Sequence, residues 1–198
     1  MVGIVILFCL WLQYEIRRTK RIENSRKDIF WETEHKANLT RRADISNLDY
    51  IAVPLLTLPM EDHRDFAINS CRDKILSLSH QKILNLTGIT NTELKLKYGA
   101  QNMKVLSEFD NNYILLVRTL NQWGELYFSL GQFSQAACIL EFAVSSHTDV
   151  GNTYRLLASV YLAMGNADKI NELIATLAST TVLNKEALTA DLLRTKNS

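Results

Sequence analysis

Hydrophobic residues recur at helical spacing over most of the chain after residue 61. A first stripe, with steps of four, four and three, predicts a helix that continues to Leu86 and ends at Gly88. A second stripe, with steps of four, three, four and three, predicts a helix of about 20 residues that ends at Gly131. The first stripe consists of Ala67, Cys71, Ile75 and Leu78, and the second of Leu116, Leu120, Trp123, Tyr127 and Leu130.

A short helix is predicted between these two stripes. Thr90 and Glu93 have the T-x-x-E spacing of a capping box, in which the two side chains satisfy free backbone donors at a helix start. Gly99 is the expected end of this helix, because glycine readily adopts the left-handed backbone of a helix terminus. Cys71 lies on an apolar stripe, and we interpret it as a small buried hydrophobe and not as a nucleophile.

The most apolar stretch of the chain is residues 2–14, which carry no charge. As a helix, these residues would rise about 20 Å, less than the roughly 30 Å of a bilayer core, and this length alone favours a secretory signal. The flanks favour a retained anchor, because the basic residues follow the apolar run and no A-x-A cleavage site appears. We therefore interpret residues 1–16 as a transmembrane helix; a cleaved signal, and a peripheral or buried helix, are the alternatives. The residues predicted to flank the membrane are Trp11, Tyr14, Arg17, Arg18, Lys20 and Arg21.

Two connecting segments follow the apolar stretch. Residues 17–43 are predicted to form a basic juxtamembrane linker or helix, with the basic cluster on the cytoplasmic side. Residues 44–60 are densely apolar and contain both prolines of the chain, Pro54 and Pro59, which forbid a continuous helix. We expect an extended strap along the helical domain, or else two short helices separated by the prolines.

An internal repeat is visible when the chain is compared with itself. The shift that carries Gly131 onto Gly165 also carries Tyr127 onto Tyr161. Further pairs at this shift are Trp123 with Leu157, Leu120 with Tyr154, Leu140 with Ile174, and Ala143 with Leu177. The first copy covers residues 117–150 and the second covers residues 151–184.

These two copies resemble the tetratricopeptide repeat, a helical hairpin of about 34 residues, which is the length of this shift. The first copy has the small, aromatic and turn residues of that family: Gly124, Tyr127, Gly131, Phe133, Ala136 and Ala143. The second copy has Tyr154, Leu157, Ala158, Tyr161 and Gly165. It departs from the family pattern at Ile170 and Leu177, where alanine is usual, and neither copy has the usual proline near its end, where Thr148 stands in the first.

The resemblance implies an all-α fold in which helical hairpins form a right-handed stack. Because at least three hairpins are usually needed for stability, residues 61–115 are expected to supply irregular hairpins that complete the stack. Residues 185–196 are expected to form a terminal helix that shields the last repeat from water. The α-helical domain would then cover residues 61–198, with a generic helical bundle as the alternative.

The resemblance also implies a binding groove on the first helix of each hairpin. The expected groove residues are Arg118, Asn121, Glu125 and Phe128 from one repeat, and Asn152, Arg155, Ser159 and Leu162 from the next. Asn121 and Arg155 are one repeat length apart, so they are expected to be neighbours that could bind a peptide backbone or an acidic group. These residues differ from the Lys- and Asn-rich set with which some family members clamp a C-terminal carboxylate. A solvated polar face without a ligand remains an alternative.

Composition narrows the class of protein. The chain has 198 residues, enough for one domain, and its 22 basic and 21 acidic residues do not favour a nucleic-acid binder. Only 2 Pro and 7 Gly provide few turns for an all-β fold. The 3 cysteines are far apart and fit neither a disulfide scaffold nor a zinc site, so a reducing compartment is expected.

No convincing set of catalytic residues is found. The chain lacks nucleotide-binding, nucleophile-elbow and zinc-protease motifs, and its four histidines are scattered. The densest polar cluster is Glu61–Asp65, whose acidic residues suit the start of a helix. We therefore expect no catalytic residue, no metal and no cofactor.

Together these patterns predict a single-pass membrane protein whose cytoplasmic helical repeat domain is monomeric and binds another protein or peptide segment. The expected role is that of a scaffold or adaptor without catalysis of its own, and no nucleic acid or small-molecule substrate is indicated. One alternative is an exported repeat protein that assists envelope proteins, with a cleaved or reversed N-terminal segment. A second is a small metal-dependent enzyme that uses Asp62 and His63.

Overall fold

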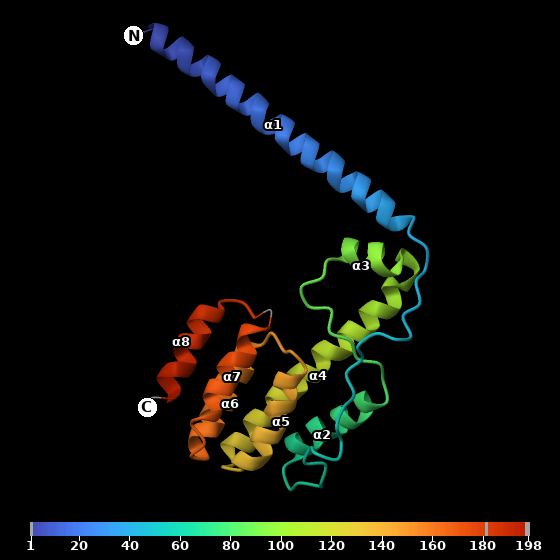
Figure 1. Cartoon of the computed structure of the whole chain (residues 1–198), viewed down its shortest axis with the longest axis vertical. Coiled ribbons are helices and arrows are strands. Elements are labelled where there is room, and N and C mark those ends of the chain that lie inside the picture. Colours follow the sequence, from blue (N-terminus) through green and yellow to red (C-terminus); the bar gives the residue numbers. More distant parts are fainter. Residues whose placement is uncertain (1, 181, 197–198) are drawn as a thin grey trace. The chain divides into compact units, whose positions relative to one another are not determined.

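The computed structural model describes residues 2–180 and 182–196, and this part of the chain is helical and contains no strand (Figure 1). The all-α class predicted from the sequence is therefore confirmed. Met1 and Thr181, which belong to the predicted anchor and the second repeat, lie outside the described residues, as do the side chains of residues 2, 4–7 and 9. The helices are α1 (Val2–Asn38), α2 (Phe66–Ser79), α3 (Asn91–Tyr98), η1 (Ala100–Asn102), α4 (Met103–Ser129), α5 (Phe133–Ser145), α6 (Gly151–Ala163), α7 (Lys169–Ala178) and α8 (Lys185–Lys196).

The chain divides into two compact units. The first unit contains Met1–Ile45 and Ile89–Met103, and the second contains Ser46–Gly88 and Lys104–Ser198. Residues 89–103, which the sequence places in the helical domain, thus belong to the same unit as α1. The reason is that α3 packs against α1.

Polar contacts hold α1 to α3 in the first unit. The carboxylate of Glu34 on α1 pairs with the ammonium group of Lys95 on α3 and accepts a hydrogen bond of 2.7 Å from the Thr92 hydroxyl. These two donors lower the pKa of Glu34 below its ordinary value. A lowered pKa in the folded state means that this contact stabilises the unit above the ordinary pKa and loses strength as the pH falls through the lowered pKa.

The first unit also contains a buried asparagine that fixes the chain after α1. The Asn102 side-chain amide donates to the carbonyl of Ala43 at 2.8 Å and to that of Tyr98 at 2.7 Å. The Ala43 amide in turn donates to the Tyr98 carbonyl at 3.0 Å. The predicted capping box is confirmed, because the Thr90 and Glu93 side chains both accept the expected bonds at the start of α3. Gly99 follows the helix with φ of +84°, as expected for its end.

The two copies of the repeat form turns of the same kind in the second unit. After α4, the Gly131 amide donates to the Phe128 carbonyl and the Gln132 amide donates to the Tyr127 carbonyl, both at 3.0 Å. After α6, the Gly165 and Asn166 amides donate to the carbonyls of Leu162 and Tyr161, which are the equivalent positions one repeat length later. Both glycines have φ above +70°, the backbone conformation that this helix end requires. The repeat seen in the sequence is thus matched in the structure by the same pair of backbone hydrogen bonds after α4 and after α6.

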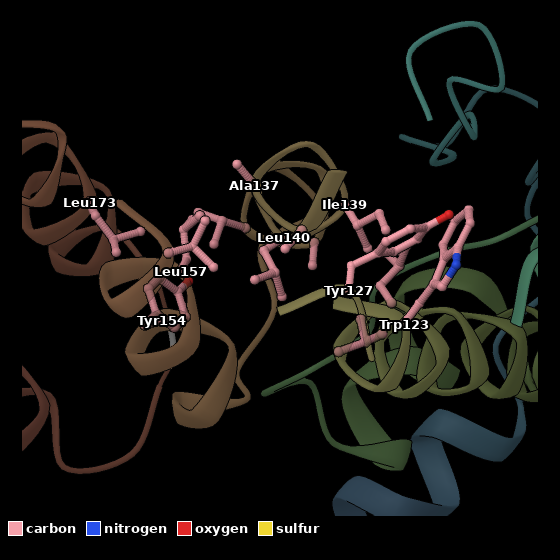
Figure 2. Close-up of a cluster of buried hydrophobic side chains, with 14 of the residues drawn as sticks. Trp123, Tyr127, Ala137, Ile139, Leu140, Tyr154, Leu157 and Leu173 are labelled. Atoms are coloured by element: carbon pink, nitrogen blue, oxygen red, sulfur yellow. The ribbon is translucent and has the colours of Figure 1, made fainter. Parts of the chain in front are cut away.

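The core of the second unit extends through successive helices. Trp123 and Tyr127 of α4 are buried beside α5, where Gly124 lets the helices approach closely: a Cβ atom on Gly124 would lie 2.6 Å from Leu140 Cδ2. Figure 2 follows this core from Trp123 and Tyr127 to Leu157 on α6 and Leu173 on α7. Four of the five residues in the predicted α4 stripe are buried. Leu130 is not: it is 48% exposed, because the helix ends at Ser129.

The helix predicted to reach Leu86 is shorter in the structure. α2 begins after Asp65, whose carboxylate accepts from the Ala67 amide at 2.7 Å, and it ends at Ser79. Ile83, Leu84 and Leu86 are nevertheless buried in a non-helical segment, whose Ile83 carbonyl accepts from the Ile51 amide at 2.9 Å. Apolar residues so close in sequence suit such a buried extended segment, and the periodicity alone does not distinguish it from a helix end. Cys71 is buried on α2, as expected.

Residues 46–60 form no helix and pack against the core of the second unit. Leu58 is buried, and Ile51, Val53 and Met60 pack against the core. The Thr57 carbonyl accepts from the Cys138 thiol on α5 at 2.6 Å. This segment therefore covers apolar surface of the helices, and at Thr57 it contacts α5.

Candidate functional site: a polar face on α4 and α6

The eight residues predicted to line a groove lie on two helices, α4 and α6, at steps of three, four and three on each. This spacing places each set of four on one side of its helix. We call these residues the α4–α6 face: Arg118, Asn121, Glu125 and Phe128 from α4, and Asn152, Arg155, Ser159 and Leu162 from α6. Arg118, Glu125, Asn152 and Arg155 are exposed, and the other four are half-buried.

Side-chain amides connect the two helices across this face. The Asn152 amide on α6 donates to Glu125 Oε1 on α4 at 2.8 Å, and the Asn121 amide donates to the same oxygen at 3.0 Å. The Asn121 carbonyl oxygen accepts from the Thr153 hydroxyl at 3.2 Å. The structure thus brings together Asn121, Glu125 and Asn152, which come from the two copies of the repeat.

Arg155 has a bonding partner that the sequence did not indicate. Its guanidinium group binds the Asp191 carboxylate on α8, with Nε and Nη2 both 3.1 Å from Oδ2. Asn121 instead bonds Thr153 and Asn152. The guanidinium therefore has an internal anionic partner. Asp191 was not identified from the sequence because α8 lies outside the two repeat copies that fixed the equivalent positions.

Arg118 lies at one end of the α4–α6 face and lines a cavity of about 300 Å³. The cavity is bounded by α4, by Thr87 and by the connection between α5 and α6. In the described part of the chain, the Arg118 guanidinium has no ion pair or side-chain hydrogen bond. Among the two arginines of the α4–α6 face, Arg118 is therefore the one whose guanidinium group is not bonded within the described residues.

A larger cavity of about 460 Å³ lies between residues 49–52, the segment around Asn85, and the ends of α5 and α7. Its polar side chains largely bond the protein itself. The hydroxyls of Ser145 and Ser146 both donate to the Phe142 carbonyl, and the Asn85 amide donates to the Tyr113 hydroxyl and the His147 carbonyl.

Asp62 and His63, the pair considered as a metal site, have other roles. Asp62 pairs with Arg72 of α2, and His63 Nδ1 accepts from the Asp65 amide at 3.0 Å. Within residues 2–180 and 182–196, no group of three or more His, Cys, Asp or Glu side chains is close enough together to hold a metal ion.

The two cysteines whose side chains are described, Cys71 and Cys138, are free thiols. Burial raises the pKa of both, and the Glu141 carboxylate adds to the shift at Cys138. Because the thiolate is the nucleophile, a raised pKa makes these thiols less reactive at neutral pH.

The predicted membrane-flanking residues all lie on α1. Trp11, Arg17, Lys20 and Arg21 are exposed, as is Tyr14, and Arg18 pairs with Glu15 at 3.4 Å. Among the residues that the structure describes, no helix combines the length and the apolar character needed to cross a membrane.

Comparisons with protein families, with curated proteins and with solved structures found no match to this chain.

Proposed function

We propose that this protein is a membrane-attached adaptor whose second unit is a tetratricopeptide-like stack and binds another protein on the α4–α6 face. The observation that carries the proposal is the pair of turns at Gly131 and Gly165, which have the same hydrogen bonds and lie one repeat length apart. Such a spacing in two consecutive hairpins supports a repeat stack with a right-handed twist. The protein would act by binding and would have no catalysis of its own.

The α4–α6 face has the properties of a protein-binding surface. Phe128 and Leu162 provide half-buried apolar area at one end, and Arg118 provides a guanidinium group at the other. Asn121, Glu125 and Asn152 are held in place by their mutual hydrogen bonds, so a partner would meet side chains that are already ordered. Asn121 and Asn152 also have the donors and acceptors needed to bond an extended peptide backbone.

Attachment to a membrane is supported by the order of residues along α1. The apolar residues 2–14 come first, and four basic residues follow within positions 17–21. Each of these would gain about 1 kcal/mol near an anionic lipid surface. We propose that the apolar segment inserts as the anchor and that the basic side chains remain at the cytoplasmic surface, with the second unit in the cytoplasm.

We expect deletion of residues 2–14 to move the protein from the membrane fraction to the soluble fraction of cells. The reason is that this stretch contains the apolar surface that would insert, whereas the rest of α1 is rich in charge. Cell fractionation with immunoblotting measures the change. Equal recovery of full-length and shortened chains in the membrane fraction would contradict the anchor.

The orientation has its own measurement. A cysteine placed at the exposed Ser134, in a chain without the native cysteines, should resist an impermeant thiol reagent in intact cells and react after lysis. Labelling of intact cells would support the exported alternative. Cys138 is a poorer reporter, because it is half-buried and bonded to Thr57.

We expect the combined substitution Arg118→Ala, Asn121→Ala and Arg155→Ala to reduce the protein partner recovered with this chain from solubilised membranes by at least about tenfold. These changes remove the free guanidinium and the donors of the α4–α6 face. The matched control is Ser134→Ala, Asp168→Ala and Glu172→Ala, three exposed positions on α5 and next to or on α7. Mass spectrometry of the captured material measures both variants, and circular dichroism verifies that both remain folded. A partner that both variants retain, or that both lose, would refute the proposed face.

A further inference from the structure

The cavity of about 300 Å³ next to Arg118 continues the α4–α6 face at the side nearer the start of α4. Ile114 lies one helical turn before Arg118 and lines the same cavity. A volume of about 300 Å³ is at the lower end of the range for ligand pockets, which suits one side chain and not a large molecule.

The walls of this cavity are mainly apolar. Val117 and the ring of Tyr113 are buried, Val150 is half-buried, and Ile114 is 40% exposed at the edge. The Tyr113 hydroxyl has no proton left to donate, since its O–H donates to the His147 carbonyl at 3.0 Å, and it also accepts from the Asn85 amide at 2.9 Å. An aliphatic stem would therefore meet apolar side chains here, and it would not displace the hydrogen bonds that the Tyr113 hydroxyl already makes.

Two carboxylates, Asp110 and Asp149, border the same cavity. Asp110 is half-buried and accepts from the Leu86 amide at 3.3 Å, whereas Asp149 is exposed at the cavity mouth and has no ion pair and no side-chain hydrogen bond in the described part of the chain. Burial raises the pKa of the Tyr113 hydroxyl, and the negative charges of Asp149 and Asp110 contribute to the same shift. The lining of the cavity therefore carries two carboxylates together with the guanidinium group of Arg118.

These features favour one kind of occupant over the others. With two carboxylates and one guanidinium, the lining has a formal charge of minus one, which disfavours an anion. A purely apolar side chain would displace water from the carboxylates without replacing its hydrogen bonds. A side chain with an aliphatic stem and a cationic end would satisfy both the walls and the carboxylates.

We propose that this cavity, the Asp149 pocket, receives a lysine or arginine side chain of the protein that binds the α4–α6 face. The inference rests on the proposed function, and it specifies the chemistry of the partner: a basic residue at the position that lies over Asp149. It differs from the expectation from the sequence alone, in which Arg155 and Asn121 could bind a peptide backbone or an acidic group. Arg155 already has an anionic partner in Asp191, whereas Asp149 has no cationic one in the described part of the chain.

The test is a titration of the full-length chain in detergent with N-acetyl-lysine methylamide, followed by NMR at the amides of Asp149 and Val150. N-acetyl-norleucine methylamide, which has the same stem without the charge, is the comparison probe. We expect saturable shifts with the lysine probe, and binding at least about tenfold weaker for the norleucine probe and for the variant Asp149→Asn. Asp168→Asn is the matched control, since this exposed aspartate lies beside α7, and it should leave the lysine titration unchanged.

Equal binding of the two probes, no saturable shift with lysine, or an unchanged titration in Asp149→Asn would each overturn the pocket. These results are separable from failure of the proposed function. If the lysine probe fails while the triple variant still loses its partner, the face is correct and the pocket is wrong. If the lysine probe binds while the triple variant keeps its partner, the pocket exists but the proposed face is wrong.

Discussion

Replacing Tyr127 by alanine should lower the free energy of unfolding of the second unit by about 3 to 5 kcal/mol. The ring is 3% exposed and packs against Trp123 and His63, with centroid distances of 6.0 and 5.9 Å. It therefore joins α4 to the segment that precedes α2. Because the surrounding helices are fixed by their own contacts, the space left by the ring would close only in part. Urea unfolding of the full chain, followed by circular dichroism, measures the change.

Tyr127→Phe is the matched control for this substitution. The Tyr127 hydroxyl has no hydrogen-bond partner in the described part of the chain, so we expect phenylalanine to cost less than about 1 kcal/mol. An alanine variant with unchanged stability would show that the ring does not fill the core. A phenylalanine variant as unstable as the alanine variant would assign the effect to the hydroxyl instead.

Replacing Gly99 by alanine should destabilise the first unit by about 3 kcal/mol, from backbone strain and steric overlap together. Gly99 has φ of +84°, and a Cβ atom would lie 2.6 Å from the Arg41 carbonyl oxygen and 2.9 Å from Arg42 Cα. Both are backbone atoms and cannot rotate away as the end of a side chain could. Native-state hydrogen exchange of the Ala43 amide, which donates to the Tyr98 carbonyl, should become faster.

Gly3→Ala is the control for the change at Gly99. Gly3 lies in α1, and a Cβ atom there would meet nothing within 4 Å, so exchange at Ala43 should remain as in the natural chain. If the Ala43 amide exchanged equally slowly in the Gly99→Ala variant and in the natural chain, the close approach of residues 41–42 to Gly99 would be refuted.

Local signals in the sequence predicted the ends of several elements correctly. The Thr90–Glu93 capping box, the turns at Gly131 and Gly165, and the helix at residues 185–196 all depend on neighbours within a few positions. Such interactions are readable because the partners are close in the sequence. The length of α2 was overestimated for a related reason. Ile83 and Leu84 continue the apolar character of the helix, but their backbone is bound by distant residues, Ile51 and Phe109.

The candidate site was predictable where the repeat fixes equivalent positions and not elsewhere. The repeat shift placed Asn121 close to α6, and the structure bonds it to residues of that helix. It could not indicate that Asp191 would pair with Arg155, or that Asp149 and Asp110 would border a cavity with Arg118. These contacts depend on how loops and the last helix pack, and no short-range pattern records that packing. The assignment of residues 89–103 to the unit of α1 was missed for the same reason.

Because α1 is one uninterrupted helix, the orientation of the residues at its start about the helix axis fixes the orientation of the residues at its end. Residues 2–38 form one helix, and each residue turns the chain by about 100° about the helix axis. The direction in which Trp11 points therefore sets the direction of Glu34 and of the α3 contact that it makes. Inserting one residue between Tyr14 and Glu34 would rotate that contact by about 100°, whereas inserting seven, almost two complete turns, would nearly restore it. For the contact between Glu34 and α3, the rotation that an insertion causes about the axis of α1 therefore matters more than the length that it adds.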